Sequence, residues 1–88
     1  MKTTWAKTRR FPHRICWTGA DDNRRTYALR ITEASGQITF DLRRTDRDAP
    51  LMYRRDGWKH AEPMHICPLD GFQSAALEWA DAICSTFA

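Results

Sequence analysis

Histidine and cysteine residues occur at two short spacings that could ligate a metal ion. His13 precedes Cys16 by three positions, His65 precedes Cys67 by two, and His60 lies nearby. On a strand, His65 and Cys67 would share a face, whereas an offset of three puts His13 and Cys16 on opposite sides. Structural zinc sites use tighter pairs such as Cys-x-x-Cys. We therefore expect no metal and no other cofactor, and a metal held by these side chains remains the alternative.

A cysteine nucleophile with a histidine base is the second chemistry that these residues could perform. Cys16 or Cys67 could pair with His13, His60 or His65. No motif places such a pair together or supplies an oxyanion hole, and 88 residues leave little room for a substrate pocket. We therefore assign no catalytic residue and predict that the protein is not an enzyme.

Arginines beside an aromatic residue form the strongest constellation. Arginine binds phosphate groups, and an exposed tryptophan can stack on an unpaired base. The candidate nucleic-acid-binding residues are Arg30, Arg43, Arg54, Arg55, Trp58 and Lys59. Burial beneath a helix is the favoured interpretation of Trp58 taken alone, because tryptophan is mostly buried in proteins. The arginines could also pair with Asp46, Asp48 and Asp56 on a solvated surface.

Charge is divided unevenly along the chain. All 14 Lys and Arg residues and seven of the 11 acidic residues lie in residues 1–59, which gives that part a formal charge of +7. The other four acidic residues give residues 60–88 a charge of −4. A basic surface favours an anionic partner, most often nucleic acid. The alternative is a small adaptor or inhibitor, of the kind found in phages and mobile elements, that uses the same polarity to bind a protein.

Two alternating segments predict the hairpin that would position the arginines. Apolar residues mark one face of each segment: Tyr27, Leu29 and Ile31 in the first, and Ile38, Phe40 and Leu42 in the second. Closing the loop at residues 33–36 sets Ile31 opposite Ile38, Leu29 opposite Phe40 and Tyr27 opposite Leu42. The other face then carries the arginines, with Arg30 opposite Thr39.

The parts that flank this hairpin are predicted as an arm, a strand and a second hairpin. Residues 1–10 are polar and basic, and we expect a flexible arm ahead of a single domain at residues 11–88. In the following strand, Phe11 would share a side with Ile15 and Trp17. Leu51–His60 predicts the second hairpin, because Asp-Gly at its centre is a strong signal for a tight turn.

The clearest element is a helix over residues 70–87. Asp70 and Gln73 are spaced as a capping box. One apolar stripe comprises Phe72, Ala76, Trp79 and Ile83, and a second comprises Leu77, Ala80, Cys84 and Phe87. This apolar arc is wider than the roughly 100° that one sheet covers. We assign the first stripe to the sheet and the second to a homodimer interface, and the alternative is a central helix in a monomer.

These elements predict an α+β fold, a twisted antiparallel sheet of four or five strands followed by one C-terminal helix packed on one face. The cysteine usage favours a reduced, cytoplasmic protein, because three cysteines cannot all pair within one chain and none has Cys-x-x-Cys spacing. No apolar run approaches the roughly 18 residues of a membrane span, and no signal peptide is expected. We therefore expect no membrane partner.

Two segments resemble the positive cofactor four family of transcriptional coactivators. Gln37–Arg43 resembles the third strand of that family, an alternating run that ends in Asp, an aliphatic residue and Arg. Ile66–Leu77 resembles its last strand leading into an amphipathic helix with an early aromatic residue. The resemblance spans about residues 14–83 and departs from the family at residues 60–63. It implies a homodimer joined through the helices and a curved sheet that binds single-stranded nucleic acid, with Arg43 at a matching basic position.

Overall fold

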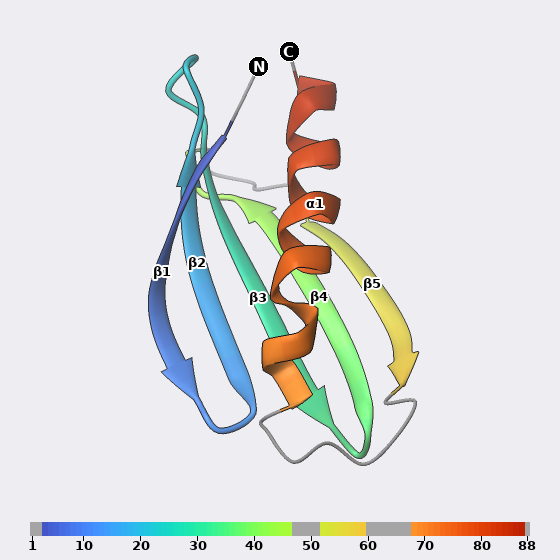
Figure 1. The fold of residues 1–88 in the computed structure, drawn as a ribbon. Coiled ribbons are helices and arrows are strands. Elements are labelled where there is room, and N and C mark those ends of the chain that lie inside the picture. The colour runs from blue at the N-terminus through green and yellow to red at the C-terminus, as the bar shows by residue number, and fades with distance from the viewer. Residues whose placement is uncertain (1–2, 47–51, 60–67, 88) are drawn as a thin grey trace.

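A five-stranded antiparallel sheet with one helix across one face forms the fold (Figure 1). The computed structural model describes residues 3–46, 52–59 and 68–87. The elements are β1 (Thr4–Phe11), β2 (Arg14–Ala20), β3 (Thr26–Ala34), β4 (Gln37–Arg44), β5 (Met52–Lys59), η1 (Pro68–Phe72), α1 (Gln73–Cys84) and η2 (Ser85–Phe87). Each strand pairs with the next one along the chain. The predicted α+β class, with one helix following the sheet, is confirmed.

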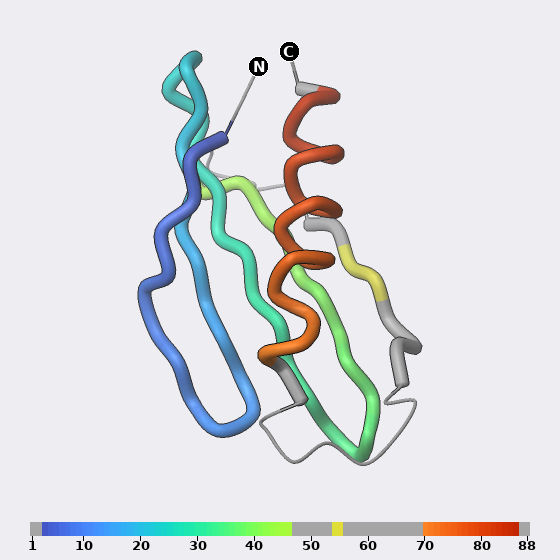
Figure 2. The backbone as a smooth tube through the Cα atoms, viewed as in Figure 1, coloured from blue at the N-terminus to red at the C-terminus, as the bar shows by residue number. Residues whose placement is uncertain are grey.

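The N-terminal segment is a strand rather than the loose arm that its composition suggests. β1 pairs antiparallel with β2 along its whole length, with a register shift between Lys7 and Arg9. The indole nitrogen of Trp5 donates a 2.8 Å hydrogen bond to the Asp81 carboxylate in α1. The start of β1 and the end of α1 accordingly lie at the same end of the molecule (Figure 2). A bulge breaks the period-two pattern, so the sequence of β1 does not look like a strand.

The turn between β1 and β2, at Pro12 and His13, places Phe11 on the side opposite to the one expected. Phe11 pairs with Arg14, whereas Arg10 pairs with the buried Ile15. Cross-strand partners share a face of the sheet. Phe11 therefore lies on the face away from α1, and it is 46% exposed. Ile15 and Trp17 are buried, as expected.

The β3–β4 hairpin forms where predicted, but its register differs by two residues. Ala34 pairs with Gln37, so the loop contains only Ser35 and Gly36. Both loop residues have positive φ, 53° and 78°, which is the backbone of a tight two-residue hairpin turn. Ile31 consequently lies opposite Phe40 instead of Ile38.

A shift of two keeps every side chain on the same face, so the assignment of faces in this hairpin survives the error. Arg30 now lies opposite Asp41, and Arg43 lies opposite Ala28. The change brings Arg30 beside an acidic partner instead of Thr39.

The expected hairpin within Leu51–His60 does not form. Met52–Lys59 is one strand, β5, which pairs antiparallel with β4 and runs through Asp56 and Gly57. Folding this segment on itself would give two strands of about four residues, shorter than the usual five to six. Pairing with β4 instead satisfies its backbone groups along a longer ladder. The register is irregular between Ile38 and Phe40.

The helix buries the apolar face of the sheet. The core comprises Ile15, Trp17, Tyr27, Leu29, Ile31, Ile38, Phe40, Leu42, Ala76, Ala80 and Cys84. The ring centroid of Phe40 lies 5.8 Å from that of Trp79 and 6.4 Å from that of Phe72. The predicted packing through the first stripe is therefore confirmed at these contacts.

The start of the helix differs from the predicted capping box. α1 begins at Gln73 after the 3₁₀ turn η1, and its N-cap residue Phe72 makes no side-chain cap bond. The Gln73 amide instead donates a 3.2 Å hydrogen bond to the Asp70 carboxylate. Arg10 of β1 forms an ion pair with the same carboxylate. Asp70 therefore ties the beginning of the helix to the sheet.

Two of the four residues assigned to a dimer interface lie in the core of the single chain. Ala80 is 0% exposed and Cys84 is 5% exposed. Small residues spaced four apart, from Ala76 to Cys84, let the helix approach the sheet closely, so this row became the buried one. Leu77 is half-buried against the core, and the side chain of Phe87 lies outside the described residues. The proposed interface set is therefore wrong for Ala80 and Cys84.

Candidate nucleic-acid interface

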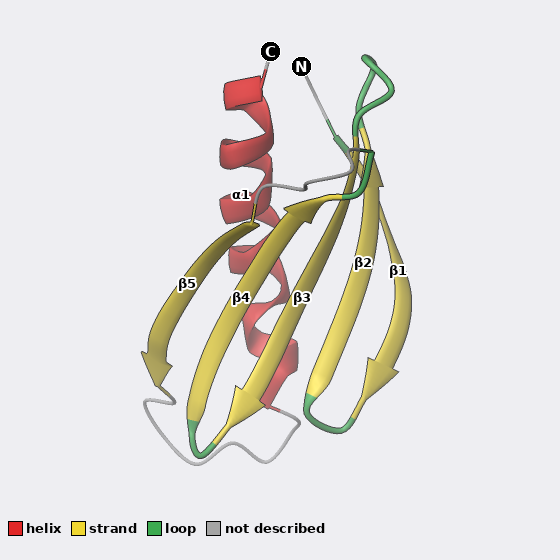
Figure 3. Ribbon diagram, turned by 180° about the vertical axis from the view of Figure 1, so that it is seen from behind, coloured by secondary structure: helices red, strands yellow, loops and turns green. Residues whose placement is uncertain are grey.

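The face of the sheet opposite α1 is not covered by any described element (Figure 3). The open face is defined here by the strand positions that alternate with the core positions. Its residues include Arg9, Phe11, Arg14, Cys16, Thr18, Ala28, Arg30, Thr32, Thr39, Asp41, Arg43 and Arg54. Five of these twelve residues are arginines and one is an aspartate, which gives the set a formal charge of +4. An anionic ligand is therefore favoured on this face.

One transverse row of the open face is held together by ion pairs. Arg30 donates hydrogen bonds of 3.1 and 3.3 Å to Oδ2 of Asp41, and Arg54 donates one of 2.9 Å to Oδ1. The Asp41 side chain is 11% exposed, whereas those of Arg30 and Arg54 are 43% and 56% exposed. One carboxylate thus positions two guanidinium groups, and the trio keeps a net charge of +1.

Arg43 lies in the next row, towards the end of β4. Its side chain is exposed, and it has no hydrogen-bond or ion-pair partner within the described part of the chain. The same holds for Arg9 and Arg14 on the first two strands. These cations remain available to a ligand, because forming a new contact would not break an existing ion pair.

A shallow hollow of about 230 Å³ lies between these rows. Its open-face lining comprises Cys16, Thr18, Ala28, Arg30, Asp41 and Arg43, with Thr8 from the bulge. Small side chains therefore form its floor, and charged side chains stand around them. A recess of this kind suits an extended anionic chain better than an enclosed small molecule, since binding pockets for drug-sized ligands are larger and deeper.

The predicted binding residues divide into three groups. Arg30, Arg43 and Arg54 lie on the open face, as expected. Arg55 pairs with the core residue Phe40, so its register places it on the side of the helix, at the β5 edge. Trp58 and Lys59 belong to β5, and their side chains lie outside the described residues, as do those of the alternative partners Asp48 and Asp56.

The open face also carries Arg9, Phe11 and Arg14, which are not among the binding residues predicted from the sequence. All three lie on the open face at the β1–β2 hairpin. The bulge between Lys7 and Arg9 removes the alternation that would assign Arg9 to a face, and the turn at Pro12 and His13 reverses the face of Phe11 relative to Ile15. Arg14 lies on the face opposite to the buried Ile15 and Trp17, and it is exposed there because α1 covers the other face.

The candidate metal and nucleophile residues are only partly described. The Nδ1 atom of His13 lies 2.8 Å from Oε2 of Glu33, and Cys16 lies on the open face, one strand away from Arg9. No group of three metal-ligating side chains occurs within residues 3–46, 52–59 and 68–87. His60, His65 and Cys67 lie outside the described residues.

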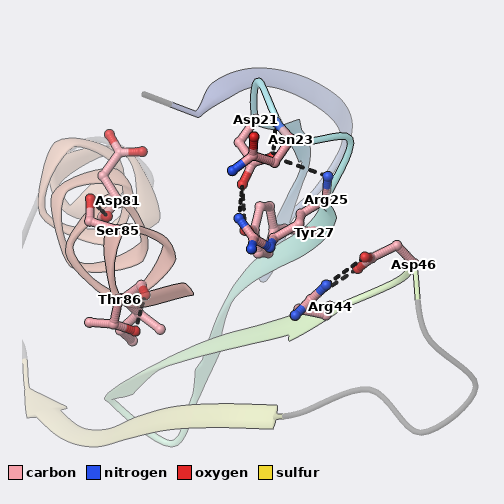
Figure 4. A network of polar contacts seen from close by, with 10 residues as sticks. Asp21, Asn23, Arg25, Tyr27, Arg44, Asp46, Asp81, Ser85 and Thr86 are labelled. Carbon is pink, nitrogen blue, oxygen red and sulfur yellow. Dashed lines mark hydrogen bonds and ion pairs between the residues drawn. The ribbon is translucent and has the colours of Figure 1, made fainter. Parts of the chain in front are cut away.

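A second polar cluster lies at the β2–β3 turn, at the end of the sheet away from the β1–β2 turn (Figure 4). The Asp21 carboxylate accepts hydrogen bonds from the Tyr27 hydroxyl at 2.9 Å, the Arg25 amide at 3.0 Å and the Asn23 amide at 2.9 Å. Burial acts to raise the pKa of Asp21, but these hydrogen bonds together lower it. Burial and the bond to Asp21 raise the pKa of Tyr27. Both carboxylate oxygens of Asp21 accept hydrogen bonds, so the cluster holds the β2–β3 turn in place.

Two further groups near this end are also held in inert states. Arg44 donates hydrogen bonds of 3.0 and 2.6 Å to Asp46, which lowers the pKa of Asp46 to about 2. Burial raises the pKa of Cys84 to about 11, so its thiol stays neutral at pH 7. A neutral buried thiol is a poor nucleophile. The polar groups at this end of the molecule therefore stabilise the fold and supply no nucleophile.

Among the described helices, none is long and apolar enough to span a membrane. Neither a protein-family model, nor a curated protein, nor a solved structure was found to match the chain.

Proposed function

We propose that the protein binds single-stranded nucleic acid on the open face of its sheet and catalyses no reaction. The observation that carries this proposal is the division of the sheet into two unlike faces. The helix covers the apolar face, and five arginines lie on the face that it leaves uncovered. The proposed contacts are Arg30, Arg43 and Arg54, with Trp58 and Lys59 of β5, whereas Arg55 lies on the helix side and is not among them.

The shape of the fold favours a single strand over a duplex. Side chains on a sheet can follow a flexible phosphate chain, and they leave its bases free to stack. Reading a duplex generally requires a basic helix or ribbon that enters the major groove. α1 contains no lysine or arginine and carries Glu78 and Asp81. An acidic helix repels the phosphate backbone, so we expect binding from one side only.

The resemblance to the positive cofactor four family supports the same proposal. We also propose that the protein forms a homodimer and is located in the cytoplasm. Of the residues predicted to form the dimer interface, Ala80 and Cys84 are buried in their own chain, whereas Leu77 is only partly buried. A contact between helices would therefore be centred on Leu77 and its exposed neighbours.

The direct test is fluorescence anisotropy with a labelled single-stranded oligonucleotide at low and moderate salt. Affinity should fall steeply with salt, because released counterions drive binding to phosphates. Arg43→Ala should weaken binding and reduce the steepness of the log–log salt slope by about 0.7, the value per phosphate contact on a single strand. The matched control is Lys7→Ala, which removes an exposed charge from a position paired with the buried Trp17, on the helix side of β1.

A gain-of-affinity variant separates nucleic-acid binding from a structural role of the arginines. Asp41→Asn removes the carboxylate that holds Arg30 and Arg54, and it raises the charge of the open face by one. If phosphates bind here, affinity should increase and the salt slope should steepen. Unchanged affinity in a folded Asp41→Asn protein would contradict binding at this row.

The alternative function, an adaptor or inhibitor that binds a protein, predicts a different result. Folded protein that shows no binding to the oligonucleotide at low salt would reject the proposal. A protein partner that is retained in a pulldown after nuclease treatment would then support the adaptor.

A further inference from the structure

We infer that Phe11 is a platform on which an unpaired base stacks, placed at the head of a diagonal of three arginines that bind successive phosphates. The diagonal consists of Arg14, Arg30 and Arg43. This inference rests on the proposed single-strand binding and gives it a site, a direction across the sheet and a base-contacting residue. It moves the centre of binding from β5 towards the β1–β2 hairpin.

The position of Phe11 is the first observation. Among the described residues, Phe11 stands out as a large apolar residue that is 46% exposed. The register places it on the open face beside Arg14. A single exposed aromatic residue is ordinary by itself. Here, however, the open face around it otherwise carries small and charged side chains. An aromatic ring next to a guanidinium group is the combination that holds a base and its phosphate.

The spacing of the arginines is the second observation. Arg14 pairs with Thr32 of β3, and Arg30 lies two residues before Thr32 on the same face. Arg30 in turn pairs with Asp41 of β4, and Arg43 lies two residues after Asp41. Each step therefore joins diagonal neighbours on adjacent strands, which are separated by about 7–8 Å. Three cations at nearly equal steps suit a repeating polyanion.

The line also crosses the hollow of the open face. Arg30 and Arg43 both line that hollow, together with Ala28, which neighbours both of them, and Thr18 on β2. Small side chains there leave room for sugars or bases between the phosphate contacts. The Arg30 side chain is 43% exposed although it is paired with Asp41, so it can contact a phosphate from the solvent side.

The expected ligand is therefore a short single strand of about four nucleotides, the lower end of the range for single-strand-binding domains. One base would stack on Phe11, and the following phosphates would lie on Arg14, Arg30 and Arg43. Stacking tolerates every base because each has a π face, so little sequence preference is expected.

The experiment compares two labelled ligands of equal length, an oligodeoxythymidine and an abasic strand with the same phosphates. Phe11→Ala should weaken binding to the thymidine strand by about 5- to 140-fold, the range for loss of one stacked base. Binding to the abasic strand should be unchanged, and Phe11→Tyr should restore affinity for the thymidine strand. The melting temperature should stay the same, because Phe11 lies outside the core.

The arginine steps are tested with the same pair of ligands. Arg14→Ala should flatten the salt slope by about 0.7 on both strands, because it removes a phosphate contact and no base contact. Lys7→Ala again serves as the control for lost charge.

The outcomes separate this inference from the function on which it rests. If the unmodified protein binds neither strand, both are rejected. If it binds the thymidine strand and Phe11→Ala binds equally well, the platform is rejected and the proposed function stands. Equal loss on both strands in Phe11→Ala would show that Phe11 supports the fold rather than a base, and would also overturn the platform.

Discussion

Neighbouring residues of β4 show how differently the two faces of one sheet are used. Phe40 is fully buried and contacts the rings of Phe72 and Trp79. Asp41, the next residue, points the other way and pairs with Arg30 and Arg54. Packing decides the residue type on the first face. On the second face no helix imposes packing, so a network of charges can persist there and can serve binding.

The largest expected effect comes from the covered face. Phe40→Ala should lower the free energy of unfolding by about 3–5 kcal/mol, because it removes a fully buried aromatic side chain and leaves a cavity. The matched control is Thr39→Ala, one residue earlier and on the open face, for which we expect less than about 1 kcal/mol. Chemical denaturation measures both. Similar losses for the two variants would contradict the division into a packed and an open face.

The second prediction sharpens the correction of the helix stripe. Ala80→Leu should destabilise the single chain by about 1–3 kcal/mol, because Ala80 has no space against the sheet. Ala82→Leu is the control, since Ala82 lies on the exposed side of the same helix. Denaturation at several protein concentrations checks the result. A stable Ala80→Leu protein with an altered oligomeric state would contradict this prediction and would indicate that Ala80 lies at an interface between subunits.

The third prediction concerns the anchoring of β1. Trp5→Phe removes the 2.8 Å hydrogen bond to Asp81 and should cost about 1–2 kcal/mol of stability. Asp81→Asn, which retains an acceptor oxygen, should have a smaller effect. Hydrogen exchange in β1 should also become faster in Trp5→Phe. Unchanged exchange would show that β1 is held by its ladder with β2 alone.

The fourth prediction tests the two-residue turn between β3 and β4. Gly36→Ala should lower the free energy of unfolding by about 1 kcal/mol, because φ at Gly36 is 78° and alanine is strained there. An added methyl group would meet no atom within 4 Å, so no steric clash should contribute to this loss. Gly36→Asn should recover part of this loss, since asparagine tolerates the left-handed region. Equal stability of Gly36→Ala and the unmodified protein would favour the longer loop.

The smallest effect is a dependence on pH at the end of β4. Hydrogen bonds from Arg44 depress the pKa of Asp46 from 3.8 to about 2. A depressed pKa stabilises the fold above the unfolded value, so this contribution is complete above about pH 4 and is lost as the pH falls towards 2. Thermal unfolding across that window should therefore change less in Asp46→Asn than in the unmodified protein. An Asp46→Asn protein with an identical pH profile would contradict this pairing.

The predictions from sequence succeeded where a residue pattern repeats locally. The alternation of β3 and β4 and the stripe of α1 assigned Phe40, Trp79 and the arginines Arg30 and Arg43 to the correct sides. They failed where a partner far along the chain decided the outcome. Asp56-Gly57 has the chemistry of a tight turn, yet pairing with β4 keeps it within a strand. Ala80 and Cys84 looked available for a dimer until the sheet covered them.

The sequence by itself determined the class of fold, the apolar sides of its central strands and helix, and the surplus of positive charge in its first 59 residues. These follow from periodicity and composition, which act over a few residues. Only the tertiary structure decided the register of β3 on β4, the addition of β1, and the turn at Pro12 and His13 that places Phe11 beside Arg14. Those features depend on backbone hydrogen bonds and packing between distant segments, and such pairings leave no periodic trace in the chain.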